Sequence, residues 1–89
     1  MKVVLQFEIP MSGLQEVNMP FGAQPLSVQE WDGGVKLWCL CDPEMTLTET
    51  RSFRLLRTGE ESQENSLAFI GTVQVNDGEF VLHLFEVKP

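Results

Sequence analysis

Apolar and polar side chains alternate with a period of two along most of this chain. Residues 3–9 show the pattern first, with an apolar side chain at every odd position. Successive side chains of a β-strand point to opposite faces, so this period is typical of a strand with one buried face. No stretch has the 3.6-residue spacing of an amphipathic helix, although residues 11–19, between Pro10 and Pro20, could form one short helical turn. The chain therefore predicts β-structure and almost no helix.

Turn residues divide this pattern into about seven strands. The strongest turn signals are Asp32-Gly33-Gly34 and Asn76-Asp77-Gly78, because Gly, Asn and Asp tolerate the positive φ angles of tight hairpins. Short strands at spacings near ten residues are typical of antiparallel sandwiches and small barrels. We therefore expect an all-β fold, a small antiparallel β-sandwich or barrel. The expected strands cover residues 3–9, 15–19, 24–31, 35–41, 46–57, 67–75 and 79–87.

Length and charge exclude several classes of protein. The 89 residues are enough for one hydrophobic core, so we expect a single β domain over residues 1–89. Six Lys+Arg against 13 Asp+Glu give a net charge of −7. This balance argues against direct nucleic-acid binding, which relies on neutralising phosphates. The apolar runs are far shorter than the roughly 20 residues of a membrane span, and the first eight residues turn polar too soon for a signal peptide. We expect a cytoplasmic protein without membrane contact.

Two of the expected strands are apolar on both faces. Residues 35–41 place Leu37 and Cys39 on one face and Trp38 on the other, and residues 80–87 have the same character. Such a strand is either central in a closed fold or covered by another subunit. A domain of this size buries only about 60–65% of its unfolded surface. We therefore expect a homo-oligomer whose interface includes the C-terminal strand.

Cys39 and Cys41 are the only cysteines. On a strand they point to the same face about 7 Å apart, which a disulfide could bridge only with backbone distortion. His83 is the only further soft ligand, so a zinc site would be incomplete. We expect buried, reduced cysteines and no metal, with redox or metal chemistry as the alternative.

The sequence contains no recognisable catalytic constellation. It has no Gly-rich phosphate loop and no nucleophile elbow, and with one His and no Tyr it has few groups for hydrolysis. Adjacent carboxylates such as Glu60 and Glu61 occupy a polar loop, where solvation is their ordinary role. We therefore expect a binding protein and not an enzyme, with no catalytic residues and no cofactor.

Half of the positive charge falls within seven residues, at Arg51, Arg54 and Arg57. On a strand, Arg51 and Arg57 share one face and Arg54 takes the other. A guanidinium fork binds phosphate or carboxylate through two parallel hydrogen bonds, so the three arginines are a candidate anion site. The alternative is ion pairing across neighbouring strands, with Glu49, Glu79 or Glu86.

Three further side chains suit either the core or a ligand. Trp38 lies in the middle of a strand and fits a core or an interface. Trp31 lies at the end of a strand and could be exposed. An exposed indole ring can stack on a base or anchor a partner. His83 alternates with apolar residues and is either a hydrogen-bonded core histidine or a ligand contact. The candidate ligand-binding residues are therefore Arg51, Arg54, Arg57, Trp31 and His83.

Several short stretches form an ordered set along the chain. They are Met19-Pro20-Phe21-Gly22-Ala23, Leu26-Ser27-Val28-Gln29, Leu37-Trp38-Cys39-Leu40-Cys41-Asp42-Pro43, Arg51-Ser52-Phe53-Arg54, Thr58-Gly59, Phe69-Ile70-Gly71-Thr72-Val73-Gln74 and His83-Leu84-Phe85-Glu86. In this order they resemble a family of small uncharacterised proteins of tailed bacteriophages and prophages, over essentially the whole chain. Cys41 and Glu60 depart from the pattern, which usually has an aliphatic residue and a His there. The resemblance implies a phage origin, an all-β fold and the cytoplasm of an infected bacterial host.

Three functions are compatible with these features. The first, by analogy with phage accessory proteins, is counter-defence through sequestration of a small anionic, nucleotide-derived ligand in pockets between subunits. The alternative is an acidic protein–protein inhibitor that occupies the basic groove of a host defence protein or nucleic-acid-binding protein. The third is a virion or assembly component.

Overall fold

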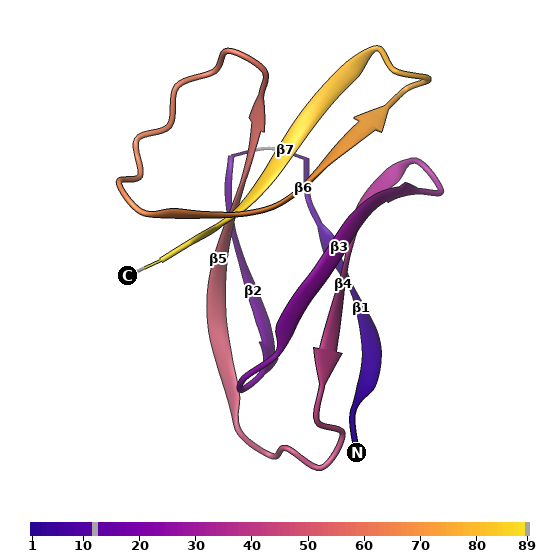
Figure 1. The fold of residues 1–89 in the computed structure, drawn as a ribbon, viewed down its shortest axis with the longest axis vertical. Coiled ribbons are helices and arrows are strands. Elements are labelled where there is room, and N and C mark those ends of the chain that lie inside the picture. The colour runs from indigo at the N-terminus through magenta and orange to yellow at the C-terminus, as the bar shows by residue number, and fades with distance from the viewer. Residues whose placement is uncertain (12, 89) are drawn as a thin grey trace.

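The alternating sequence folds into seven antiparallel strands that form two sheets (Figure 1). This computed structural model describes residues 1–11 and 13–88, and it contains no helix within them. No described segment could therefore cross a membrane as a helix. The helical turn considered for residues 11–19 is replaced by a strand from Leu14, and Ser12 lies outside the described residues. The strands are β1 (Val3–Ile9), β2 (Leu14–Pro20), β3 (Gln24–Trp31), β4 (Gly34–Cys41), β5 (Thr48–Arg57), β6 (Leu67–Val75) and β7 (Phe80–Val87).

The two sheets have the strand orders β1-β4-β3 and β2-β5-β7-β6. Every neighbouring pair within a sheet is antiparallel. The sheets pack face to face, and β3 of one runs beside β6 of the other (Figure 1). The prediction of an all-β fold, a small antiparallel sandwich or barrel, is therefore confirmed, and the fold is the sandwich.

Both predicted tight turns form. In the β3–β4 hairpin, Trp31 pairs with Gly34, and the two residues between them have positive φ, 57° at Asp32 and 82° at Gly33. In the β6–β7 hairpin, residues 76–78 all have positive φ. These angles match the right-handed twist of the strands, which explains why Asp, Asn and Gly occupy the turns.

The inner faces of the two sheets supply the core. Phe53, Leu37 and Leu84, from β5, β4 and β7, are fully buried there. Along β4, buried and half-buried residues alternate from Val35 to Cys41, as the period of two requires. The remaining core residues are Ile9, Met19, Ala23, Val28, Cys39, Leu55, Val73, Val75 and Leu82.

The two strands that are apolar on both faces occupy interior places in their sheets. β4 lies between β1 and β3, and β7 lies between β5 and β6. A central strand has neighbours on both sides, so side chains on its outer face are half-buried by those neighbours. Their composition is thus explained within one chain, and the homo-oligomer stays a prediction.

One edge of the sandwich is closed by the close approach of β3 and β6. A Cβ on Gly71 of β6 would lie 2.9 Å from Cγ1 of Val28 on β3, so only glycine fits without movement. Each strand is also irregular at this edge, with a register shift between Pro25 and Ser27 in β3 and another between Phe69 and Gly71 in β6. The two sheets therefore pack closely against each other along β3 and β6.

Cys39 and Cys41 are buried and free of any disulfide, as expected. Both point into the core from β4. Burial is the main cause that raises the pKa of the Cys39 thiol to about 11, with Cys41 adding to the effect. Burial also raises the pKa of the Cys41 thiol, so both thiols are protonated and unreactive near neutral pH.

Candidate functional site

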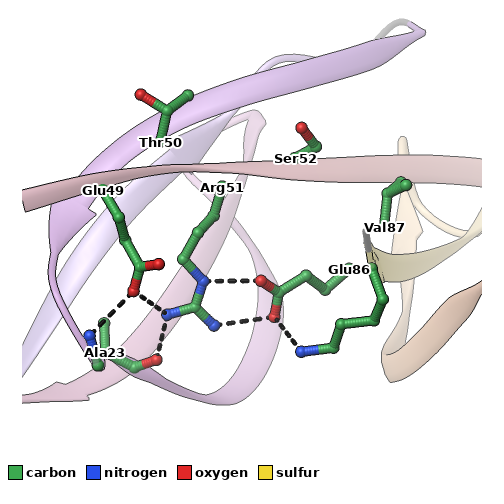
Figure 2. Close-up of a pocket in the computed structure, with 9 residues that line it drawn as sticks. Ala23, Glu49, Thr50, Arg51, Ser52, Glu86 and Val87 are labelled. Atoms are coloured by element: carbon green, nitrogen blue, oxygen red, sulfur yellow. Dashed lines mark hydrogen bonds and ion pairs between the residues drawn. The ribbon is translucent and has the colours of Figure 1, made fainter.

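A cavity of about 570 Å³ lies at one end of the sandwich, where β5 begins and β7 ends (Figure 2). Arg51 precedes the buried Phe53 by two residues, and Glu86 follows the buried Leu84 by two residues. The period of two therefore turns both charged side chains toward the interior. The segment at Gly22 and Ala23, between β2 and β3, completes the wall.

Arg51 and Glu86 form a bidentate ion pair in this cavity. Nε of Arg51 donates to Oε2 of Glu86 at 2.7 Å, and Nη2 donates to Oε1 at 2.8 Å. The side chains are 13% and 8% exposed. Hydrogen bonding from Arg51 lowers the pKa of Glu86, and the same bond raises that of Arg51. Both groups are therefore charged at neutral pH.

The remaining donors of Arg51 are also largely engaged. Nη1 donates to the carbonyl oxygen of Ala23 and lies 3.7 Å from Oε2 of Glu49. Glu49 in turn accepts a hydrogen bond of 2.9 Å from the backbone N–H of Gly22 (Figure 2). Arg51 thus joins β5, β7 and the β2–β3 connection. An anionic ligand would have to compete with two carboxylates for it.

Lys88 is the more accessible cation of the cavity. Its Nζ lies 3.4 Å from Oε1 of Glu86, and its side chain is about half exposed. The two cations, Arg51 and Lys88, face two carboxylates, Glu49 and Glu86. The formal charges of the lining therefore cancel, and Lys88 has donors directed at solvent.

Arg54 lies on the outer face of its sheet, opposite to Arg51, as the alternation predicted. Its Nε and Nη2 donate to the two oxygens of Glu64 at 2.8 and 2.7 Å. Ser62 Oγ donates to Glu64 Oε1 and accepts from the Glu64 backbone N–H. The bond from Arg54 is the main cause that lowers the pKa of Glu64 to about 2. The pair ties the acidic loop after β5 onto the sheet.

The last arginine of the group, Arg57, is exposed at the opposite end of β5. Its guanidinium carbon lies 6.0 Å from the centroid of the Phe80 ring, within the range of a cation–π contact. Together with Met11 and Val75 these two residues border a smaller cavity of about 180 Å³. Among the described residues, Arg57 has no ion-pair partner.

His83 is hydrogen-bonded, but it is not a core residue. It lies on the outer face of β7, where Nε2 is 2.8 Å from Thr58 Oγ1 and Nδ1 is 2.9 Å from Thr72 Oγ1. Of the two alternatives given for His83, the core position is wrong, because Leu82 and Leu84, one residue to either side, take the inner face. Both ring nitrogens have partners, so a ligand would have to displace a threonine.

Trp31 is exposed, which the sequence analysis gave as one possibility, and its ring contacts that of Trp38. Their ring centroids are 6.1 Å apart with an interplanar angle of 83°, an edge-to-face arrangement. Trp38 is half-buried on the outer face of β4, and its Nε1 is buried without a hydrogen-bond partner in the described part of the chain. The two indoles form an aromatic patch on the sheet that lacks the arginines.

The five predicted ligand residues do not converge within one chain. Arg51 lines the cavity, Arg54 and His83 occupy the outer face of the four-stranded sheet, Arg57 lies at the far end of β5, and Trp31 belongs to the other sheet. A site that used all five would need another copy to complete it. Sequence reasoning named Glu86 and Glu49 as possible partners of arginine, but it missed Glu64 and Lys88. The acidic run before β6 was the available signal for Glu64.

A group of three or more potential metal ligands does not occur within residues 1–11 and 13–88. In a comparison with known families, a model described as a domain of unknown function, DUF7352, matches residues 1–89. The chain belongs to the DUF7352 family. No curated protein and no solved structure matches it. Membership of DUF7352 brings no activity with it, so function must be argued from the geometry.

Proposed function

We propose that this DUF7352 protein is an acidic binding protein that occupies a cationic surface on a partner protein. The observation that supports this function is the division of the charges. Within the described residues, four of the six cations are held in ion pairs inside the chain: Lys36, Arg51, Arg54 and Lys88. These pairs use only four of the 13 carboxylates. The surface left for a partner is therefore strongly anionic.

Most carboxylates that have no ion pair in the described part of the chain lie in turns and connections or directly beside them. Glu30 and Asp32 belong to the β3–β4 hairpin, and Asp77 and Glu79 belong to the β6–β7 hairpin. Both hairpins project toward the same end of the molecule (Figure 1). Carboxylates gathered on one end of a molecule attract a basic partner over long range and accelerate association. The two hairpins are thus the proposed contact with the partner.

The proposed partner is a host protein with a groove that binds nucleic acid, such as a nuclease or repressor. Such grooves present Lys and Arg to phosphates, and an array of carboxylates competes for the same cations. The resemblance to phage proteins supports a place in the cytoplasm of an infected bacterium and a role against host defences. On this proposal the protein acts as an inhibitor and catalyses no reaction.

The test compares two double neutralisations. Asp32→Asn with Asp77→Asn removes one charge from each hairpin, and Asn suits the positive φ at both sites. Asp42→Asn with Glu44→Gln removes the same charge from the β4–β5 connection. Partners are captured from host lysate, purified, and titrated at several salt concentrations. The hairpin variant should weaken binding and flatten its salt dependence, whereas the control should change both little. The proposal would be refuted if the two variants weakened binding equally, or if the affinity did not change with salt concentration.

A second candidate, sequestration of a small anionic nucleotide-derived ligand, is favoured by the cavity at Arg51 and Lys88. Its volume of about 570 Å³ suits a small ligand, and Lys88 offers a partly exposed ammonium group. Native mass spectrometry of protein from infected cells would reveal a retained ligand. Lys88→Gln should abolish that retention. Retention that survives this substitution would exclude the cavity.

A further inference from the structure

β1 is the least protected strand edge of the sandwich. It pairs with β4 on one side, and on its other side no described strand continues the sheet (Figure 1). Its register with β4 is regular from Val3 to Ile9, without a bulge. Natural sheets protect such edges with proline, bulges or inward-pointing charges, because unpaired backbone groups accept a further strand. β1 has none of these features.

The other three edges differ from β1. β3 and β6 cover one another where Gly71 meets Val28, and both have irregular register. β2 ends in Pro20 and contains one carboxylate, Glu16, with no cation. A second copy of β2 would therefore bring no opposite charge to match Glu16. β2 is also an open edge with regular register against β5, so what distinguishes β1 is a sequence without proline whose charges can match those of a second copy.

β1 also exposes apolar side chains on both faces. Val4 on the outer face is 53% exposed. Leu5 points to the side of the core and pairs with the buried Cys39, yet it is 41% exposed. Leu5 is exposed because β1 and β2 make few contacts on this open side of the sandwich. An additional strand beside β1 would cover both side chains.

The sequence of β1 is complementary to itself. In an antiparallel pair of two copies centred on Leu5, Lys2 of one copy lies opposite Glu8 of the other, and this occurs twice. Lys2 directly precedes β1, and the proposed pairing extends the strand by this one residue, which places Lys2 and Glu8, both even-numbered, on the outer face. Cross-strand pairs of opposite charge stabilise a sheet. Lys2 is exposed and has no ion-pair partner among the described residues. The side chain of Glu8 is 70% exposed, although it contacts Lys36.

The same register also matches the apolar residues. Leu5 lies opposite Leu5 of the second copy, and Val3 lies opposite Phe7, all on the core side. Shifting the register by two residues places Lys2 opposite Gln6 or Pro10 and loses both ion pairs. Shifting it by one residue places the core face of one copy against the outer face of the other. Of these registers, the one centred on Leu5 both pairs the opposite charges and keeps the apolar side chains together on the core side.

We infer that β1 is a homodimer interface, in which two copies pair β1 with β1 in antiparallel orientation about a two-fold axis at Leu5. The three-stranded sheets then join into one continuous six-stranded sheet. Two short strands bury less than the roughly 1,200 Å² of a standard stable interface, so the dimer should be weak and concentration-dependent. This inference does not depend on the acidic contact proposed above, because it uses the backbone edge of β1 and a second copy of the chain, and neither hairpin turn takes part.

The first test is sedimentation velocity over a wide concentration range at about 0.15 M salt, with any tag at the C-terminus. The wild-type protein should shift from monomer to dimer as concentration rises. Leu5→Lys places two ammonium groups opposite each other at the axis and should weaken the dimer on the order of a hundredfold. The control Leu14→Lys changes a 47% exposed leucine on β2 and should leave the dimer intact. A wild-type monomer at all concentrations, or equal behaviour of the two variants, would overturn the inference.

The second test is a charge exchange that simple loss of structure would not mimic. Lys2→Glu opposes two carboxylates and should weaken the dimer about tenfold. Adding Glu8→Lys to the same chain restores opposite charges across the axis and should recover most of the affinity. Thermal denaturation verifies that both variants fold, since Glu8→Lys also places a lysine beside Lys36. If the double variant associates no better than Lys2→Glu alone, the proposed register is wrong.

Discussion

Two arginines on one strand, three residues apart, form bidentate pairs of nearly the same geometry in two different environments. Arg51 points inward and joins Glu86, which is 35 residues away in sequence. Arg54 points outward and joins Glu64, which is 10 residues away. The inner pair connects β5 to β7 and to the β2–β3 segment, whereas the outer pair fastens a single loop. The same chemistry thus closes the end of the sandwich on one face and attaches a surface segment on the other.

Acid should produce the largest change, because it removes both pairs. The folded-state pKa of Glu64 is about 2, against 4.5 for an unperturbed glutamate, and that of Glu86 is also lowered. A depressed pKa stabilises the fold above the unfolded value, and this stability is lost as pH falls through the folded value. Urea unfolding should therefore show a falling free energy of unfolding between about pH 4.5 and about pH 2. A free energy that stays constant over this range would contradict the role of both carboxylates.

Arg51→Gln should have the next largest effect. The substitution leaves the buried Glu86 with Lys88 as its one ion-pair partner among the described residues. Breaking a mostly buried ion pair lowers the free energy of unfolding by about 3 kcal/mol. The midpoint of urea unfolding measures the loss. The acid dependence should also become shallower than in the wild-type protein, because Glu86 no longer has its main partner. If Arg51→Gln lowers the free energy of unfolding no more than Arg54→Gln does, the inner pair contributes no more to stability than the outer pair.

Arg54→Gln should destabilise the fold clearly less, because its pair is somewhat more exposed than the inner pair, at 19% and 16% against 13% and 8%, and it holds a surface loop instead of joining two strands. Its distinctive effect is local: the segment from Thr58 to Ser66 should exchange its amide hydrogens faster and become sensitive to protease. Hydrogen exchange read by mass spectrometry measures this. Arg51→Gln is the control, since it should not loosen that segment selectively.

The smallest expected effect is that of Thr58→Ala, about 0.5–1 kcal/mol for one partly exposed hydrogen bond. Thr58 begins the same loop and contacts His83 Nε2. If Arg54 and Thr58 fasten one loop, the double variant should lose less stability than the sum of the single variants. Strict additivity would mean that the two contacts hold independent segments.

Much of this comparison could be predicted from residue spacing. The alternation on β5 assigned Arg51 and Arg54 to opposite faces, and Glu86 was among three possible partners of the arginines. The partner of Arg54 was missed because Glu64 lies in an irregular loop, where no period indicates the direction of a side chain. The core position considered for His83 was wrong for a related reason: β7 is apolar on both faces, so its pattern does not reveal which face is the inner one.

The sequence by itself determined the local structure of this protein. Alternation defined the strands, and Asp32-Gly33 and Asn76-Asp77-Gly78 determined two turns, because these depend on interactions between near neighbours. Only the tertiary structure decided which sheet each strand joined, which edge was closed at Gly71 and which was left open at β1. Those outcomes depend on how the strands pack at long range, where many pairings satisfy the same alternation and burial of the whole core selects among them.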